Sequence, residues 1–285
     1  MTQKQRIVIK VGTSVLTDGT RHLSRQHMLG IIQQAAKLHQ QGHEIILVSS
    51  GAVAAGRERL NFPDFGRNVP TKQMLAAVGQ SRLMQIYGEL FDIFQIVVAQ
   101  VLLTRDDLGN RTRFLNARDT LLTLIDQRII PVINENDTIA THEIRIGDND
   151  NLSALVATVI EADLLILLTD QPGLFTSDPR QDKDAQLIER VEHIDEETWA
   201  RAGGSVTGLG TGGMVTKIQA AQLASRSGVP TRIASGKEAD VLVRIVNDET
   251  VGTHFAAEPT PLESRKRWLL LDKTHGTVKV DAGAA

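Results

Sequence analysis

The chain has 285 residues, enough for one large or two modest domains with a hydrophobic core of ordinary size. Its 31 Lys and Arg residues against 34 Asp and Glu residues give a formal net charge of −3, so bulk charge does not indicate a nucleic-acid or membrane partner. The lack of cysteine excludes disulfides, thiolate metal sites and cysteine nucleophiles, and it suits a reducing cytoplasm.

The chain opens with a β-α-β pattern, which predicts parallel strands. Residues 6–11 form an apolar strand so near the start that we expect no signal peptide, and no apolar run is long enough to span a bilayer. A helix capped by Ser24 and ended by Gly42 leads to a strand at residues 44–49. Lys10 is anomalous, because a lysine in an apolar strand needs either an anion or solvent at the strand end, and this segment supports both interpretations equally.

Small residues follow each of these strands: Gly12 after the first, Ser50 and Gly51 after the second. They let backbone N–H groups approach an anionic ligand, although a plain tight turn accounts for them equally well.

The elements that come next are typical of scaffold or of subunit packing: a loop at 61–70, a helix at 71–91, a strand at 96–103 and a helix at 112–127.

The stretch at residues 132–151 is rich in Asn and Asp. A strand at 128–133 ends just before Asn134 and Asp137, and a second polar group, Asp148 to Asn151, begins the next helix after a predicted hairpin. Ligands of open α/β sheets bind at the carboxyl ends of strands and beside helix N-termini. Asx turns and an N-cap explain one or two of these residues but not all of them. We therefore expect a ligand site here.

The most apolar strand, residues 164–168, suits the centre of a parallel sheet and ends in Thr169 and Asp170. If the strands are parallel, their polar ends share one edge of the sheet. That edge gathers Gly12, Ser50, Asn134, Asp137 and Asp170.

The segment at residues 203–217 is rich in glycine and runs into a helix, and Lys217 lies in the first turn of that helix. Exposed N–H groups, a helix N-terminus and a lysine together indicate a phosphate cradle rather than a flexible linker. Gly208, Gly210 and Gly213 fit the dinucleotide pattern G-x-G-x-x-G only weakly, because no hydrophobic strand directly precedes them. The chain then closes with a β-α-β pattern: a strand at 230–234, a helix at 239–246 and a strand at 251–255.

Two lysines beside glycine-containing turns indicate phosphoryl transfer, which mainly requires positive charge around the transferring group. No general base accompanies Lys10 and Lys217. A carboxylate acceptor has a pKa near roughly 4 and is already ionised at neutral pH, so its phosphorylation requires no general base. Asp150 is suited to hold the two ammonium groups in place.

Six segments, in order, resemble the glutamate 5-kinases of the amino acid kinase family. They are K-V-G-T-S-V-L (10–16), S-S-G-A-V-A-A-G (49–56), V-I-N-E-N-D (132–137), G-D-N-D-N-L-S-A (147–154), L-L-T-D-Q-P-G-L (167–174) and G-L-G-T-G-G-M-V-T-K (208–217). The resemblance covers residues 7–268. It implies an α/β fold, a three-layer α-β-α sandwich on a mainly parallel sheet.

The resemblance also implies ATP-dependent phosphorylation of the γ-carboxylate of L-glutamate to L-glutamyl 5-phosphate, the first step of proline biosynthesis. Its implied catalytic residues are Lys10, Lys217 and Asp150. Its implied substrate residues are Ser50, Gly51, Asn134, Asp137, Asp148 and Asn149. Its implied ATP-binding residues are Lys10, Gly12, Thr169, Asp170, Thr211, Gly212, Gly213, Met214 and Lys217. Mg²⁺ is expected to be held through the nucleotide phosphates, without protein ligands. A homo-oligomer, dimer or tetramer, and feedback inhibition by L-proline are further implications.

Residues 1–258 match the kinase domain, whereas 259–285 resemble a linker and the first strand of a truncated C-terminal PUA-like domain, with strands predicted at 268–271 and 277–280. Three alternatives accompany this interpretation: another family member such as an acetylglutamate or carbamate kinase, a non-catalytic amino-acid or nucleotide sensor, and a dinucleotide-dependent oxidoreductase. The paired N-E-N-D and G-D-N-D-N segments favour glutamate, and the retained lysines and Asp150 argue against a sensor.

Overall fold

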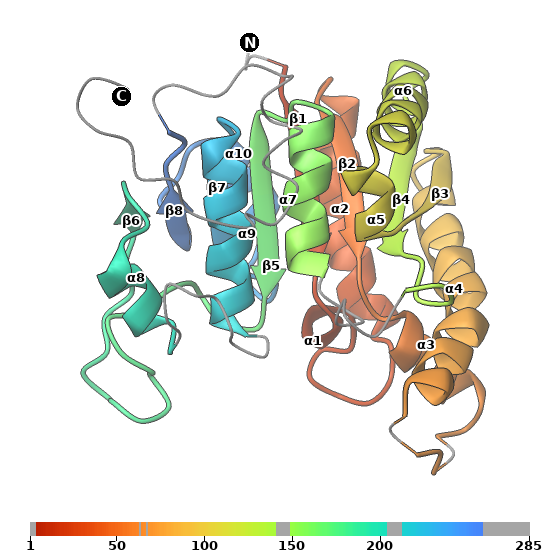
Figure 1. The fold of residues 1–285 in the computed structure, drawn as a ribbon, viewed down its shortest axis with the longest axis horizontal. Coiled ribbons are helices and arrows are strands. Elements are labelled where there is room, and N and C mark those ends of the chain that lie inside the picture. Colours follow the sequence, from red (N-terminus) through yellow and green to blue (C-terminus); the bar gives the residue numbers. More distant parts are fainter. Residues whose placement is uncertain (1–3, 63, 67, 141–148, 204–212, 259–285) are drawn as a thin grey trace.

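A computed structural model of the chain describes residues 4–62, 64–66, 68–140, 149–203 and 213–258. Within these residues the fold is a three-layer α-β-α sandwich on an eight-stranded sheet of order β3-β4-β2-β1-β5-β7-β8-β6 (Figure 1). The strands are β1 (Arg6–Val11), β2 (Glu44–Ser49), β3 (Val98–Leu103), β4 (Ile130–Glu135), β5 (Leu164–Thr169), β6 (Arg190–Val191), β7 (Thr231–Ser235) and β8 (Thr253–Phe255). The helices are α1 (Thr13–Leu16), α2 (Arg25–Gln40), α3 (Ala52–Arg59), α4 (Val69–Asp92), α5 (Arg105–Gly109), α6 (Arg111–Asp126), α7 (Asn149–Val159), α8 (Glu196–Arg201), α9 (Met214–Arg226) and α10 (Val241–Val246).

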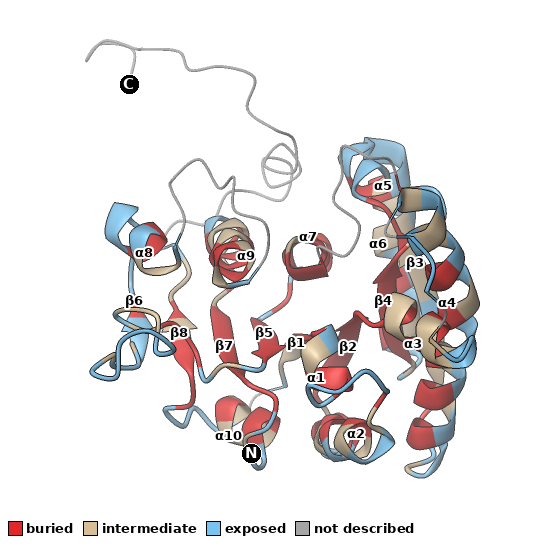
Figure 2. Cartoon of the chain, turned by 90° about the horizontal axis from the view of Figure 1, so that it is seen from below, coloured by how far each residue is buried: buried red, intermediate tan, exposed pale blue. Residues whose placement is uncertain are grey.

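Two hydrophobic cores lie on opposite faces of the sheet. One core joins the sheet to α2, α4 and α10, and the other joins it to α6, α7 and α9 (Figure 2). Strand β1 contributes side chains to both cores, since Ile7 and Ile9 belong to the first core and Val8 belongs to the second. Side chains alternate across a strand, so Lys10 lies on the same face as Val8, beneath α7 and α9.

The predicted parallel arrangement is confirmed for the central strands. β1 pairs in parallel with both β2 and β5, and β4 pairs in parallel with β2 and β3. The carboxyl ends of these strands therefore meet at one edge, as the sequence predicts.

The closing β-α-β pattern was wrong in one respect, because β8 runs antiparallel to β7. Helix α10 has only six residues and so rises about 9 Å. It does not return the chain to the edge at which β7 begins, and β8 runs back along β7 instead. At this turn Gly252 has φ 68°, and a Cβ there would lie 2.1 Å from the carbonyl oxygen of Ile233.

Some helices and strands begin or end a few residues away from the positions that the sequence predicts. Asn68 caps α4 by accepting from the backbone N–H of Thr71 at 2.9 Å, so Val69 and Pro70 are helical rather than part of the predicted loop. The short elements β6, α5 and α8 were not predicted, because two to six residues are too few for a periodic signal. The hairpin predicted between Asp137 and Asp148 depends on residues 141–148, which lie outside the described ranges, as do the segment after residue 258 and the strands predicted at 268–271 and 277–280.

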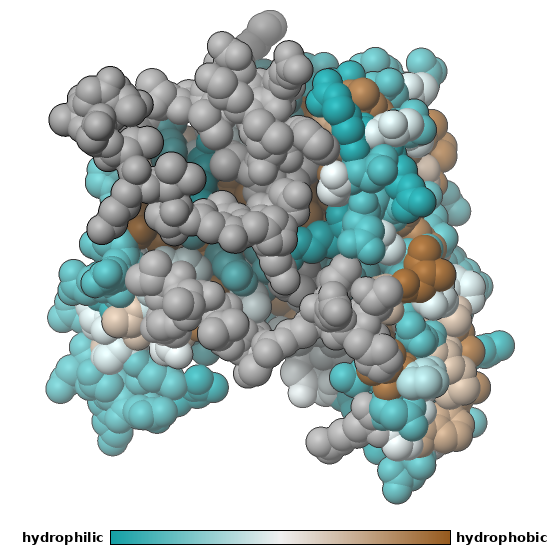
Figure 3. All heavy atoms as spheres, viewed as in Figure 1, coloured by the Kyte–Doolittle hydropathy of each residue, from teal (hydrophilic) through white to brown (hydrophobic). Residues whose placement is uncertain are grey.

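Figure 3 shows mostly hydrophilic side chains on the face that it views, with hydrophobic ones along the edge that carries β3 and α4. Four large hydrophobic side chains at this side of the sheet are exposed: Met74 (41%), Ile93 (61%), Val97 (62%) and Ile139 (64%). None of the helices among the described residues combines the length and the hydrophobicity that crossing a membrane requires.

Candidate active site

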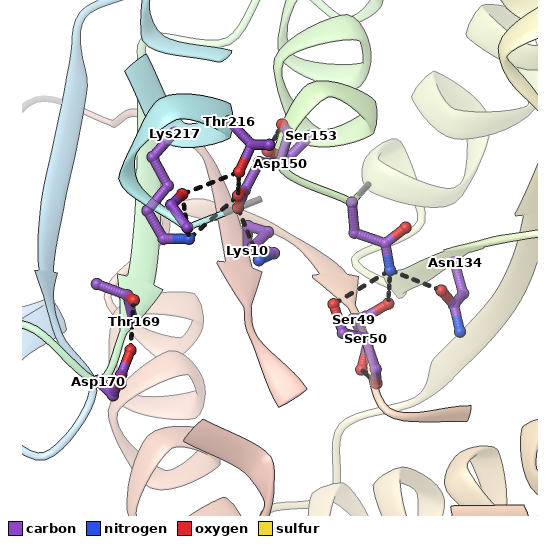
Figure 4. A network of polar contacts seen from close by, with 12 residues as sticks. Lys10, Ser49, Ser50, Asn134, Asp150, Ser153, Thr169, Asp170, Thr216 and Lys217 are labelled. Atoms are coloured by element: carbon purple, nitrogen blue, oxygen red, sulfur yellow. Dashed lines mark hydrogen bonds and ion pairs between the residues drawn. The ribbon is translucent and has the colours of Figure 1, made fainter. Parts of the chain in front are cut away.

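Lys10, Asp150 and Lys217 form a buried ion-pair network at the carboxyl edge of the sheet (Figure 4). Lys10 Nζ lies 2.7 Å from Asp150 Oδ1, and Lys217 Nζ lies 3.1 Å from Asp150 Oδ2. The three residues are 6%, 5% and 8% exposed. They come from β1, the first turn of α7 and the first turn of α9, elements that the parallel sheet brings together. The structure thus resolves the two sequence interpretations of Lys10, which is buried and meets a carboxylate.

The charges of this network favour an anion. Burial alone would raise the pKa of Asp150, but the positive charges of Lys10 and Lys217 outweigh it and lower the pKa to about 2. One carboxylate against two ammonium groups leaves a net positive charge in a site with little access to water. A phosphoryl group that gains charge on its oxygens would be stabilised here.

Thr216, which the sequence analysis did not select, completes the network. Its Oγ1 lies 2.7 Å from Asp150 Oδ2, to which it donates, and 3.0 Å from the carbonyl oxygen of Gly213. Lys217 Nζ also lies 3.4 Å from that carbonyl oxygen. A threonine in the first turn of a helix is ordinarily read as part of a cap, so only its position next to Lys217 could have marked it.

A second polar cluster surrounds Asn149. The Asn149 Nδ2 group lies 2.6 Å from the carbonyl oxygen of Ser49, 2.8 Å from Asn134 Oδ1 and 3.3 Å from Ser50 Oγ. The Ser50 N–H donates to the carbonyl oxygen of Val11 at 3.1 Å, which ties the end of β2 to the end of β1. Three of the predicted substrate residues are therefore in contact, and Figure 4 shows them beside the lysine network.

Among the described residues, the carboxylate oxygen Asp137 Oδ1 and the amide oxygen Asn149 Oδ1 are buried without a hydrogen-bond partner. Burial raises the pKa of Asp137 to about 6, and no cation of the part of the chain that the structure describes opposes the shift. Buried acceptors without partners are costly and rare in folded proteins. The arrangement therefore suits a ligand that brings hydrogen-bond donors, preferably with a positive charge.

Three glycines, Gly12, Gly51 and Gly213, lie in turns at this edge. A Cβ on Gly12 would lie 3.5 Å from Lys10 Nζ and 3.4 Å from the carbonyl oxygen of Leu168, which are ordinary contact distances, so any side chain larger than alanine would extend beside the lysine. Gly51 and Gly213 have φ 95° and 78°, which favour glycine, and each immediately precedes a helix.

The remaining predicted residues divide into two groups. Thr169 ends β5 and donates through Oγ1 to Asp170 Oδ1 at 3.0 Å, and Figure 4 shows this pair apart from the hydrogen bonds of the lysine network. Met214 begins α9. Asp148, Thr211 and Gly212 lie outside the described residues.

The described residues contain no group of three or more His, Cys, Asp or Glu side chains that could hold a metal ion. Both oxygens of Asp150 already face lysines.

Comparison with known proteins supplies relatives of the whole chain. Residues 5–235 match the amino acid kinase family. The chain is 55% identical over 284 residues to glutamate 5-kinase of Sodalis glossinidius, a match that covers 100% of this chain and 77% of that protein. It is 56% identical over 283 residues to glutamate 5-kinase of Photobacterium profundum, covering 99% of this chain and 75% of that protein.

The fold also matches a solved structure. The crystal structure of UMP kinase from Bacillus anthracis superposes with a TM-score of 0.61 at 16% sequence identity, over 89% of this chain and 96% of that chain. At this identity the likeness concerns the fold, and it agrees with the predicted three-layer arrangement.

Proposed function

This chain belongs to the amino acid kinase family, and we propose that it is a glutamate 5-kinase, which transfers the γ-phosphoryl group of ATP to the γ-carboxylate of L-glutamate. A carboxylate oxygen attacks the γ-phosphorus, the bond between that phosphorus and the β–γ bridging oxygen breaks, and ADP leaves. The products are L-glutamyl 5-phosphate and ADP, and the reaction would open proline biosynthesis. No proton has to move, because the attacking carboxylate is ionised at neutral pH.

The observation that carries this proposal is the buried network of Lys10, Asp150 and Lys217. The two ammonium groups are fixed by one carboxylate before any substrate binds, so they need little rearrangement when charge spreads over the phosphoryl oxygens. Asp150 acts as the group that positions both lysines. Its low pKa makes it a poor base, which agrees with an acceptor that has no proton to lose.

The unpartnered acceptors favour a free amino acid as the acceptor substrate. Asp137 Oδ1 and Asn149 Oδ1 would receive hydrogen bonds from the α-ammonium group of glutamate, and Ser50 and Asn134, which both contact Asn149, would complete the site. An N-acetylated amino acid offers one N–H and no positive charge, so it would leave Asp137 without a counter-ion. This favours glutamate over acetylglutamate as substrate.

We propose that ATP binds at the same carboxyl edge of the sheet, beside the amino-acid site. Lys10, Gly12, Thr169, Asp170 and the segment 211–217 are the proposed ATP contacts, with Gly213 and Met214 at the N-terminus of α9 beside the phosphates. Bound Mg²⁺ would neutralise phosphate charge and would be held through the phosphates. The exposed hydrophobic side chains near β3 and α4 support a homo-oligomer, dimer or tetramer. Cytoplasmic location, L-proline feedback and the lack of a nucleic-acid partner stay predictions.

The test is Mg-ATP-dependent hydroxamate formation, in which hydroxylamine traps an acyl phosphate. We expect a signal with L-glutamate and none with L-aspartate or N-acetyl-L-glutamate. A signal with N-acetyl-L-glutamate alone would identify the related kinase instead. Protein that is folded and binds ATP and glutamate without forming hydroxamate from any acceptor would be a sensor, and the proposal would be wrong.

A further inference from the structure

The orientation of the Asn149 amide is fixed by the backbone. Its Nδ2 group lies 2.6 Å from the carbonyl oxygen of Ser49, which can accept a hydrogen bond but cannot donate one. The amide nitrogen must therefore face β2. Because the two ends of an amide are opposite, Asn149 Oδ1 faces the other way, where it is buried and has no hydrogen-bond partner within the described ranges.

The orientation of Asn134 is fixed in the same manner. Its Oδ1 accepts from the backbone N–H of Glu135 at 2.9 Å and from Asn149 Nδ2 at 2.8 Å, and both of these groups are donors. Its nitrogen must therefore face away from Asn149. There, Asn134 Nδ2 donates to Gln80 Oε1 at 2.7 Å. Gln80, Asn134 and Asn149 form one chain of amides whose direction two backbone groups dictate.

We propose that Gln80 is a positioning residue of the amino-acid site, which holds Asn134 and through it Asn149 so that Asn149 Oδ1 is presented to the α-ammonium group of the substrate. This rests on the proposed function, since it takes the substrate to be a free amino acid. Gln80 itself lies on α4 and reaches the site through Asn134.

Helix α4 is well placed to hold such a chain. Gly79, the neighbour of Gln80, packs so closely on α3 that a Cβ there would lie 1.8 Å from the carbonyl oxygen of Ala52. Further along α4, Tyr87 Oη lies 2.9 Å from Ser49 Oγ, in the residue whose carbonyl oxygen orients Asn149. One helix therefore supports both of the residues from which Asn149 takes its orientation.

The second contact of Gln80 supplies a control. Gln80 Nε2 lies 3.5 Å from Oε1 of Gln100, an exposed residue of the edge strand β3. This contact is at the limit of hydrogen-bond length and lies outside the amide chain. Replacing Gln100 removes a partner of Gln80 and leaves the acceptor that Asn134 uses.

Three variants of the full chain test the proposal. Gln80→Leu removes the acceptor, Gln80→Glu keeps an acceptor for Asn134 Nδ2, and Gln100→Leu is the control. For Gln80→Leu we expect the Kd and KM for L-glutamate to rise about tenfold while the KM for ATP stays within about twofold, because one buried donor loses its partner. Gln80→Glu should recover most of the glutamate affinity, and Gln100→Leu should match the wild type.

Binding of L-glutamate is measured by calorimetry, which does not require turnover, so this test is separate from that of the kinase activity. Unchanged glutamate affinity in Gln80→Leu would overturn the proposal. So would equal losses for glutamate and ATP, or a Gln80→Glu variant as weak as Gln80→Leu, since both indicate a merely structural role. Wild-type protein that does not bind glutamate would overturn both this inference and the proposed function. Binding without hydroxamate formation would overturn only the function.

Discussion

Lys10 Nζ lies 2.7 Å from Asp150 Oδ1, and this contact joins the central strand of the sheet to the first turn of α7. The other oxygen of Asp150 faces Lys217 on α9. Each carboxylate oxygen thus serves one lysine. The ammonium groups, which would repel each other in a buried site, are held together by a charge placed between them.

Replacing Asp150 by Asn tests this arrangement. Two buried ammonium groups would lose their shared counter-ion, and removal of one partner from a buried ion pair typically costs about 3–5 kcal/mol. We expect Asp150→Asn to lower the free energy of unfolding by that order in denaturant titrations. In the folded fraction, kcat should fall by about 10²–10³, because the lysines are no longer held in place.

Asp119→Asn is the matched control for Asp150→Asn. Asp119 pairs with Arg118 at 3.2 Å, but its side chain is 66% exposed, so the pair contributes about 0–1 kcal/mol. The same substitution there should leave stability and turnover near the wild type. If Asp150→Asn were as mild as Asp119→Asn, the carboxylate would not be organising the lysines.

Replacing Lys217 by Ala tests whether this lysine acts on the transferring phosphoryl group or on the binding of the acceptor substrate. Lys217 Nζ hydrogen-bonds to Asp150 and to the carbonyl oxygen of Gly213, and among the described residues no hydrogen bond joins it to Ser50, Asn134 or Asn149. We expect Lys217→Ala to lower kcat by about 10²–10³ while the KM for glutamate changes by less than about threefold. The hydroxamate assay at varied glutamate gives both constants. Lys37→Ala, at an exposed position on α2, is the control.

Equal losses in turnover and in glutamate binding would contradict the role of Lys217. Such a result would mean that Lys217 stabilises the bound substrate and the transition state equally, rather than the transferring phosphoryl group in particular. Calorimetric titration of glutamate into the variant distinguishes the two, because it reports binding without chemistry.

The sequence predicted the lysine network because its members belong to local patterns. Lys10 interrupts an apolar strand, Lys217 follows a glycine-rich turn, and Asp150 stands at a helix start. The chemistry of phosphoryl transfer suggested that Asp150 holds the two lysines, and in the structure each oxygen of Asp150 lies beside one of them.

The sequence did not reveal the supporting residues, which carry no local signal. Gln80 reads as an ordinary polar position of a helix, and Ser49 as the last residue of a strand. Each is linked to Asn149 only through contacts between residues distant along the chain, such as Gln80 with Asn134 across 54 positions. The antiparallel β8 was missed for a related reason, since helical periodicity does not say how far a short helix carries the chain.

Asp137 should make glutamate binding dependent on pH. Burial raises its pKa to about 6, so in the ligand-free protein it gains a proton as the pH falls below that value. The proton removes the charge that would pair with the α-ammonium group. We expect the Kd for glutamate to rise as pH falls from 7 to 5, within a range where the substrate carboxylates stay ionised, and Asp137→Asn to bind weakly at every pH.

Asp137 also links pH to stability. Its pKa in the folded protein is above the ordinary value of 3.8, so the folded state binds the proton more tightly than the unfolded state. The resulting stabilisation is fully present below pH 3.8 and is lost as pH rises through about 6. At pH 7, Asp137→Asn should therefore raise the free energy of unfolding of the ligand-free protein by about 1–3 kcal/mol. A destabilised Asp137→Asn variant would show that the ionised carboxylate is satisfied in the folded protein.

Two glycines of α4 should respond in opposite directions to substitution by alanine. Alanine is favoured over glycine inside a helix by about 1 kcal/mol. At Gly88 a Cβ would meet no atom of the described residues within 4 Å apart from the backbone of its own helix, so Gly88→Ala should stabilise the protein by about that amount. At Gly79 a Cβ would lie 1.8 Å from the carbonyl oxygen of Ala52 and 2.4 Å from the backbone nitrogen of Gly56, so α3 and α4 would have to separate.

Overpacking of this kind costs about 1–3 kcal/mol or more, which exceeds the gain in helix propensity. We therefore expect Gly79→Ala to lower the free energy of unfolding. It should also raise the KM for glutamate, because α3 begins directly after Ser50 and Gly51 and because Gln80 is the next residue of α4. Thermal unfolding and hydroxamate assays on both variants measure these effects. If Gly79→Ala were stabilised like Gly88→Ala, the close approach of α3 and α4 would not be needed to hold the amino-acid site.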